Sequence, residues 1–256
     1  MSDAEPVLLS RLVEYLDSLL DIPAFPDYSR AVNGLQVEGP QRITRVAAAV
    51  DAAEYSVDGA VTAGADLLLV HHGLFWANPS PLTGRMYRRI APLMRHNVAV
   101  YSAHLPLDAH PELGNCIRLA RLLDLDPYAR FASYEGRDIG YLARTDEELD
   151  AFRARVRAHL GEPVEVIRGG PGRVREVAVL TGSGAGFVEE AVRLGADTLL
   201  TGEAAHHTVV DARELGLNVV LAGHYRTETL GVQALAAHLE EAFGLPWTFL
   251  DHPSSL

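Results

Sequence analysis

The stretch Val61-Thr62-Ala63-Gly64-Ala65-Asp66-Leu67-Leu68-Leu69 returns, with changes, as Val192-Arg193-Leu194-Gly195-Ala196-Asp197-Thr198-Leu199-Leu200. The shift along the chain that relates Val61 to Val192 also relates Val46-Ala47 to Val177-Ala178, and we call it the repeat offset. Each copy predicts a buried strand, a turn, an amphipathic helix closed by Gly-Ala-Asp, and a second buried strand, which is a βαβ unit of a parallel sheet. A third apolar run follows each copy. The sequence therefore predicts an α/β fold with two similar lobes.

The segment between the two copies predicts an insertion. Residues 137–143 and 164–167 have the composition of strands, and residues 146–160 have that of a helix. Outside the copies, we expect helices over residues 6–20 and 229–243 and a short strand over residues 247–250. We expect residues 1–128 and 221–256 to form the first lobe, and residues 129–220 to form the second lobe with the inserted strand-helix-strand segment.

The composition is that of an ordinary globular protein and excludes several classes of function. The chain has 256 residues, of which 48% are hydrophobic and 22% charged. The formal net charge of −12 makes nucleic-acid binding an unfavourable hypothesis. The apolar runs are too short to cross a membrane, and the acidic N-terminus lacks the basic start of a signal peptide. We therefore expect a cytoplasmic protein without membrane contact.

Two residue types limit the chemistry further. All 22 basic side chains are arginine, which excludes both a Schiff-base lysine and a P-loop lysine. The single cysteine, Cys116, cannot form a disulfide within the chain, and we expect it to be a buried small hydrophobic residue of a helix.

Histidines follow the strands of the first copy. His71 and His72 end the apolar run of the second strand, and the third strand leads to His104 and Asp108. The carboxyl ends of parallel strands are where ligands collect in such sheets. Taken alone, a His-His pair at a strand end more often packs or forms hydrogen bonds than binds a metal ion.

The second copy differs at the corresponding places. Gly202 and Glu203 replace His71 and His72, and the third strand leads to His224 and Glu228, which are four residues apart on one helical face. Such a pair is common on helix surfaces. Together with the histidines of the first copy, however, it favours a metal site, provided that the two lobes face each other across their strand ends.

The residues also carry a family resemblance. The motifs that carry this resemblance lie at residues 33–39, 70–76, 104–115, 201–203 and 222–228. These motifs are similar to those of the Nif-three-like dinuclear-metal family, whose bacterial members often carry the name GTP cyclohydrolase I type II. The resemblance implies a two-metal centre ligated by His71, His72, Asp108, His224 and Glu228, and subunits that assemble into a homohexameric ring.

Five nitrogen and oxygen ligands are more than one tetrahedral ion takes, so we expect two divalent ions. Mixed imidazole and carboxylate ligands suit Zn, Fe, Mn or Co, and the sequence does not choose among them. Glu228 is the better candidate for a bridging carboxylate. We expect His71 and His72 to bind different ions, because neighbouring side chains of a strand point apart. His104 and Glu203 are the candidate catalytic residues, as a proton shuttle or as an orienter of a ligand imidazole, although a purely structural hydrogen bond would explain either.

Two hypotheses about function follow. The first is a metal-dependent hydrolase that acts on a small molecule such as a nucleotide, with the opening of the guanine ring of GTP as its most specific version. The second is a non-catalytic metal-binding ring that serves as a scaffold or metal chaperone.

Three further features have two interpretations each. Gly182–Gly186 is either an anion cradle or a tight turn. Arg226 either reaches an anionic group of the substrate or pairs with an acidic neighbour. Asn33–Gly39 has the Asn-Gly signal of a turn before a short strand, and could also form a pocket wall.

Overall fold

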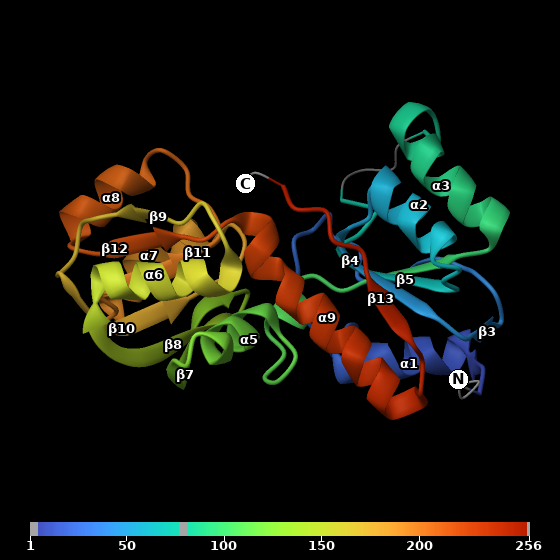
Figure 1. Ribbon diagram of the computed structural model, residues 1–256, viewed down its shortest axis with the longest axis horizontal. Coiled ribbons are helices and arrows are strands. Elements are labelled where there is room, and N and C mark those ends of the chain that lie inside the picture. Colours follow the sequence, from blue (N-terminus) through green and yellow to red (C-terminus); the bar gives the residue numbers. More distant parts are fainter. Residues whose placement is uncertain (1–4, 77–80, 255–256) are drawn as a thin grey trace. The chain divides into compact units, whose positions relative to one another are not determined.

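The computed structural model describes residues 5–76 and 81–254. The chain forms two compact units: unit 1 comprises Met1–Leu107 with Gly231–His252, and unit 2 comprises Asp108–Leu230 with Pro253–Leu256. Each unit contains its own mixed sheet with helices packed on it (Figure 1). The predicted α/β fold with two similar lobes is confirmed. Domain boundaries at 128 and 220 stay a prediction, because compactness alone does not show that a unit folds independently.

Unit 1 is built on a five-stranded sheet with the order β13-β4-β5-β6-β2. Its strands are β2 (Gly34–Val37), β4 (Val46–Asp51), β5 (Leu67–His72), β6 (Ala99–Ser102) and β13 (Trp247–Phe249). All neighbours are parallel except β2, which is antiparallel to β6. Because helices cover both faces of this sheet, β4 and β5 are almost continuously apolar and buried.

The remaining elements of unit 1 lie around this sheet. They are β1 (Val7–Leu8), α1 (Leu9–Leu19), β3 (Arg42–Ile43), α2 (Glu54–Thr62) and α3 (Gly84–His96). Val57 and Leu93, from α2 and α3, pack in one hydrophobic cluster with Ala47, Leu68 and Val100 of the sheet. Figure 1 shows α1 on the opposite side of the sheet. The predicted helix over residues 6–20 starts later, because β1 pairs with β3.

Unit 2 is built on a six-stranded sheet with the order β7-β8-β10-β11-β12-β9. Its strands are β7 (Asp126–Tyr134), β8 (Arg137–Glu148), β9 (Glu165–Ile167), β10 (Arg173–Val179), β11 (Thr198–Thr201) and β12 (Asn218–Leu221). The central strands β10, β11 and β12 are parallel, and the others are antiparallel to their neighbours. The predicted insertion is present as β8, α6 and β9, and its two strands flank the parallel centre. The hairpin partner β7 was not predicted.

The helices of unit 2 complete its core. They are α5 (Asn115–Leu122), α6 (Leu149–Leu160), the 3₁₀ turn η1 (Gly184–Phe187), α7 (Val188–Arg193) and α8 (Thr208–Leu215). Leu119 of α5 and Phe152 of α6 pack with Val177, Leu200 and Val220 of the sheet.

Two helices contain a unit boundary. The one-turn helix α4 (Leu105–Asp108) belongs to unit 1 up to Leu107, and α9 (His224–Phe243) belongs to unit 2 up to Leu230. The helix α9 begins five residues before the predicted start at Thr229, so His224 and Glu228 both lie in its first turns. In the part of the chain that the structure describes, no helix has both the length and the apolar character of a membrane span.

The repeat is visible in the register of the strands. Val46 lies opposite Leu67 in the first copy, and Val177 lies opposite Thr198 in the second, so both pairs keep the repeat offset. The aspartate of each Gly-Ala-Asp motif has the same task. Asp66 accepts hydrogen bonds from the amides of residues 44 and 45, and Asp197 accepts them from the amides of residues 175 and 176. Each carboxylate thereby fixes the chain at the neighbouring strand.

Candidate metal centre

Three histidines of unit 1 gather where β5 and β6 end. Because the two strands are parallel neighbours, His71 and His72 at the end of β5 lie beside His104, which follows β6. The ring centroid of His71 lies 4.8 Å from that of His72 and 4.9 Å from that of His104. One nitrogen from each ring lies within 4.8 Å of the others, so the group could hold a metal ion. His104 thus joins the two histidines that were predicted as ligands.

Each of these imidazoles is oriented through its Nδ1 atom. The Nδ1 of His71 lies 2.9 Å from the carbonyl oxygen of Ala103, that of His72 lies 2.9 Å from Oδ1 of Asp51, and that of His104 lies 2.9 Å from Oδ1 of Asp27. A carbonyl or carboxylate oxygen can only accept, so Nδ1 donates in all three cases. In a neutral imidazole the lone pair is then on Nε2, which is the form that binds a metal ion.

Asp27 is itself held in place. Its carboxylate accepts hydrogen bonds from the side-chain amide of Asn33 at 2.8 Å and from the backbone amides of Tyr28 and Leu105 at 2.7 and 3.1 Å. Burial raises the pKa of Asp27, but the hydrogen bond and positive charge of His104, with the hydrogen bonds from Asn33 and from the amide of Tyr28, outweigh it and lower the pKa below its ordinary value. Asp27 therefore stays ionised beside His104.

The motif Asn33–Gly39 is part of the support of this cluster. Asn33 accepts a hydrogen bond from the backbone amide of His104 at 2.8 Å, and Gln36 accepts one from the amide of Leu74 at 2.6 Å. A Cβ atom on Gly73 would lie 2.2 Å from the side-chain nitrogen of Gln36, so only glycine allows this approach. The motif forms β2 as predicted and also fixes both segments that carry the histidines.

Unit 2 contains a second set of candidate ligands. The Nε2 atom of His224 lies 3.1 Å from Oε2 of Glu228, one helical turn further along α9. Its Nδ1 atom lies 3.0 Å from Oε1 of Glu203, which follows β11. Burial lowers the pKa of His224, but the hydrogen bonds and charges of Glu228 and Glu203 outweigh it and raise the pKa to about 9. The carboxylates that stabilise a proton on this ring would equally stabilise a metal cation.

A glycine makes room for Glu228. Gly182 has a φ of +63°, and a Cβ atom there would lie 2.2 Å from Oε1 of Glu228. The amide of Gly182 donates to Thr227 at 3.0 Å, and that of Gly184 donates to Thr201 at 2.9 Å. These two amides are engaged within the turn and are not available to an anion, and the role of Gly182–Gly186 stays a prediction.

Asp108, at the end of α4, is buried in unit 2. Its Oδ1 accepts a hydrogen bond from Asn115 at 2.8 Å and a longer one from Thr181 at 3.5 Å. Cys116 is fully buried beside it, and burial together with the charge of Asp108 raises the pKa of this thiol to about 12. Such a thiol is a poor nucleophile, and Cys116 is the buried residue of a helix that the sequence predicted. Arg226 donates to the carbonyl of Pro163 within unit 2.

The structure thus groups the predicted residues by unit. His71, His72 and His104 form one cluster, His224, Glu228 and Glu203 form another, and Asp108 is held by Asn115. The role of each as a metal ligand or catalytic residue stays a prediction. Sequence reasoning missed Asp27 and Asp51. Asp51 is the last residue of β4, beside β5, so the search for polar residues at strand ends that selected His72 could have found it. Asp27 lies in a loop without any such signal.

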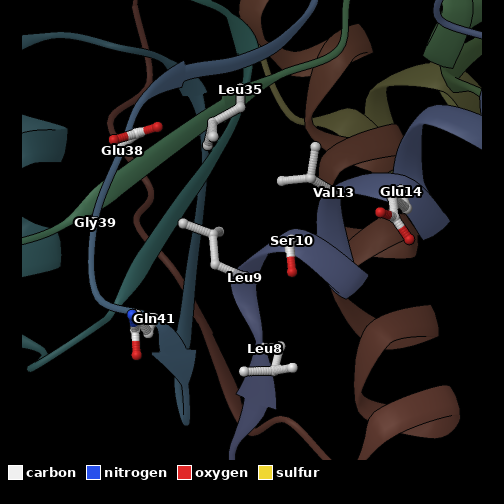
Figure 2. Close-up of a pocket in the computed structure, with 9 residues that line it drawn as sticks. All are labelled: Leu8, Leu9, Ser10, Val13, Glu14, Leu35, Glu38, Gly39 and Gln41. Carbon is white, nitrogen blue, oxygen red and sulfur yellow. The ribbon is translucent and has the colours of Figure 1, made fainter.

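A separate hollow of unit 1 is lined by other residues. It has a volume of about 660 Å³ and lies between α1 and the segment that follows β2. Figure 2 shows Leu9, Val13 and Leu35 around it, with Glu14 and Glu38 also in its wall. Its lining contains no histidine, so this hollow is distinct from the histidine cluster.

A family comparison accounts for these motifs. The sequence model of Duf34/NIF3 (NGG1p interacting factor 3) matches residues 7–254. The chain belongs to the Duf34/NIF3 family. A relative from Deinococcus radiodurans, named "GTP cyclohydrolase 1 type 2 homolog", is 45% identical over 247 residues, which cover 96% of this chain and 93% of the relative. A relative of the same name from Pyrococcus horikoshii is 41% identical, with 96% of this chain and 98% of the relative covered.

Solved structures of the family have the same fold. Protein ybgI, described as of unknown function, superimposes with a TM-score of 0.91 at 35% identity and covers 98% of this chain and 100% of its own. TTHA1606 from Thermus thermophilus superimposes with a TM-score of 0.87 at 43% identity, with the same coverage. The resemblance to the family inferred from the motifs is therefore confirmed along nearly the whole chain.

Proposed function

We propose that this chain is a metal-dependent hydrolase that holds two divalent transition-metal ions with His71, His72, Asp108, His224 and Glu228. The observation that carries the proposal is the common orientation of the imidazoles. Each of the three predicted histidine ligands directs its Nδ1 to a carbonyl or carboxylate oxygen, as histidine ligands of metal ions do. Imidazole nitrogens and carboxylate oxygens without a thiolate suit Zn, Fe, Mn or Co.

The arrangement requires the strand ends of the two units to share the ions. Glu228 is the proposed bridge, because a carboxylate can bind two ions, and His71 and His72 would bind different ions. When bound, two such ions would supply Lewis-acid stabilisation of the negative charge that develops during hydrolysis.

The other residues would hold and orient protons and ligands. Asp27 fixes the Nδ1–H of His104, which leaves Nε2 to accept or donate a proton beside the ligands. We therefore propose proton transfer as the role of His104. Glu203 accepts from Nδ1 of His224 and would act as a positioning residue for that ligand.

The proposed substrate is a nucleotide or a related small molecule. The printed names of the relatives, which contain GTP cyclohydrolase, support this class, and the opening of the guanine ring of GTP is its most specific version. The net charge of −12 disfavours a nucleic-acid substrate. We further propose that the chain forms a homohexamer in the cytoplasm, which light scattering would test against six times 27.8 kDa.

The test combines elemental analysis with turnover. Protein purified without added metal should contain two transition-metal ions per chain, and the His104→Ala variant should keep both ions while losing activity. Metal-loaded protein should release formate from GTP, or a product from a panel of nucleotides and cyclic amides. Two bound ions without any metal-dependent product would instead support the scaffold or metal-chaperone hypothesis. A chain that binds no ion would contradict both.

A further inference from the structure

Two aromatic side chains stand beside the histidine cluster of unit 1. The ring of Trp76 lies 4.7 Å from that of His104 and 5.4 Å from that of His72, measured between centroids. The ring of Tyr28 lies 5.7 Å from that of His104. We call Tyr28 and Trp76 the aromatic pair. They come from different segments of the chain and meet at the same imidazole.

Both rings are accessible, and the backbone is held at Tyr28 and, two residues before Trp76, at Leu74. Tyr28 is 52% exposed, and Trp76 is partly exposed. The amide of Tyr28 donates to Asp27 at 2.7 Å, and the segment leading to Trp76 is fixed where Leu74 donates to Gln36. The residues that orient His104 and its neighbours therefore also position the aromatic pair. An accessible ring on a fixed backbone binds a ligand with little loss of conformational entropy.

The angles between the rings restrict the kind of contact. Trp76 stands at 84° to His104, whereas Tyr28 is tilted from it by only 36°. Tyr28 and Trp76 are therefore not parallel to each other, and the pair is not a parallel sandwich. Stacked and edge-to-face contacts are both favourable between aromatic groups, so each ring of the pair offers a contact surface to a flat ring beside His104.

We propose that the aromatic pair binds the planar heteroaromatic ring of the substrate beside His104. This inference rests on the proposed hydrolase and names the part of the substrate that the chain recognises. Nucleobases present such a ring, and stacking on an aromatic side chain is a common way to bind them. The pair lies beside the candidate ligands of the proposed hydrolase, where the substrate would bind, which favours a small planar ligand as the occupant.

The sequence offers a direct reporter of this contact. Trp76 and Trp247 are the two tryptophans of the chain, so Trp247→Phe leaves Trp76 as the sole indole. Guanosine added to this Zn-loaded variant should change the Trp76 fluorescence in a saturable way, and ribose 5-phosphate, which lacks the aromatic ring, should not. In the same background, Tyr28→Leu should weaken guanosine binding about tenfold.

Tyr87→Leu is the matched control, since Tyr87 is 55% exposed on α3 of the same unit and is not part of the aromatic pair. It should change the Kd by less than about twofold. In the otherwise unchanged chain, Trp76→Leu should weaken guanosine binding about tenfold by calorimetry, and Trp76→Phe should restore most of it. Metal content should stay the same in all these variants.

The outcomes separate this inference from the proposed function. Saturable guanosine binding that depends on Tyr28 and Trp76, without any turnover, would support the inference and contradict the hydrolase. Turnover with an unchanged KM in Trp76→Leu would overturn the inference and leave the hydrolase standing. Equal binding of ribose 5-phosphate, or a change of molecular mass in Tyr28→Leu, would also overturn it, the latter by showing a contact between chains.

Discussion

The two sheets of this protein have equivalent central strands, β4-β5-β6 and β10-β11-β12, but different polar residues at the ends of these strands. In unit 1, Asp51 and His72 lie opposite each other on β4 and β5, and the carboxylate accepts the Nδ1–H of the imidazole. At the repeat offset, unit 2 has Gly182 and Glu203 in these two places. There the carboxylate follows β11, and it accepts from His224 of α9 instead.

The comparison shows how two copies of one scaffold come to carry different candidate ligands. Unit 1 keeps imidazole and carboxylate on neighbouring strands. Unit 2 replaces the first position by glycine, which leaves space for Glu228, and obtains its imidazole from a helix. In both units a carboxylate accepts a hydrogen bond from Nδ1 of an imidazole. The same type of contact is therefore present in both units, although its residues lie at different places of the repeat.

The largest expected effect comes from the carboxylate that only unit 2 supplies. Glu228→Gln removes the negative charge of the proposed bridge, and we expect metal affinity to fall more than about 100-fold. Glu241→Gln, an exposed glutamate of the same helix, is the control and should bind metal normally. Competition with a chelator measures both. Unchanged affinity in Glu228→Gln would remove this residue from the site.

The next effect tests the glycine that distinguishes the two units. Gly182→Ala places a Cβ atom on Glu228 at a positive φ, so we expect the metal-free protein to lose about 1–3 kcal/mol of stability and the loaded protein to bind metal more weakly. Gly186→Ala, where nothing lies within 4 Å, should change neither. Urea unfolding of both variants measures the difference. Equal stability would mean that Gly182 is not needed for space.

The third effect compares the two orienting carboxylates. Asp51→Ala and Glu203→Ala should each weaken metal binding about 10–100-fold, because each leaves one imidazole without its acceptor. Asp58→Ala, an exposed aspartate of α2, serves as the reference. Calorimetric titration with Zn²⁺ measures all three. If only one of the two substitutions weakened metal binding, the claim that a carboxylate orients a ligand imidazole in both units would be wrong.

The smallest effect concerns the part of the repeat that is the same in both units. Asp66→Ala and Asp197→Ala should each cost about 0.5–1.5 kcal/mol, because each loses the hydrogen bonds to two backbone amides, which water can partly replace at these partly exposed positions. Thermal unfolding of the metal-free variants should show similar losses. A loss of stability in only one of the two variants would show that the Gly-Ala-Asp motif has different structural roles in the two copies.

Much of the scaffold could be predicted because its signals are local. The apolar runs and the repeat offset predicted β4, β5 and β6 of one sheet and β10, β11 and β12 of the other. The ends of those runs placed His71, His72 and Glu203 at strand ends. The hairpin of β7 and β8 was only half predicted, because β7 contains Pro127 and has a mixed burial pattern instead of a clear alternation.

The supporting residues of the site could not be predicted in the same way. Asp27 and Asn33 act on His104, which is 77 and 71 residues away in the sequence, through contacts that arise only after folding. Gly182 is one glycine among several in its turn, and only its distance to Glu228 shows why it matters. Periodicity predicts elements, whereas side-chain contacts between loops depend on the tertiary structure.

The central claim is that both units hold the same pair of ions. Anomalous diffraction at the absorption edge of the metal found by elemental analysis tests it most directly. We predict two peaks about 3.5–4 Å apart. His71 and His72 of unit 1 should contact different peaks, and His224 and Glu228 of unit 2 should contact the same pair of peaks. A single peak held by His71, His72 and His104 alone, with none beside Glu228, would contradict the claim.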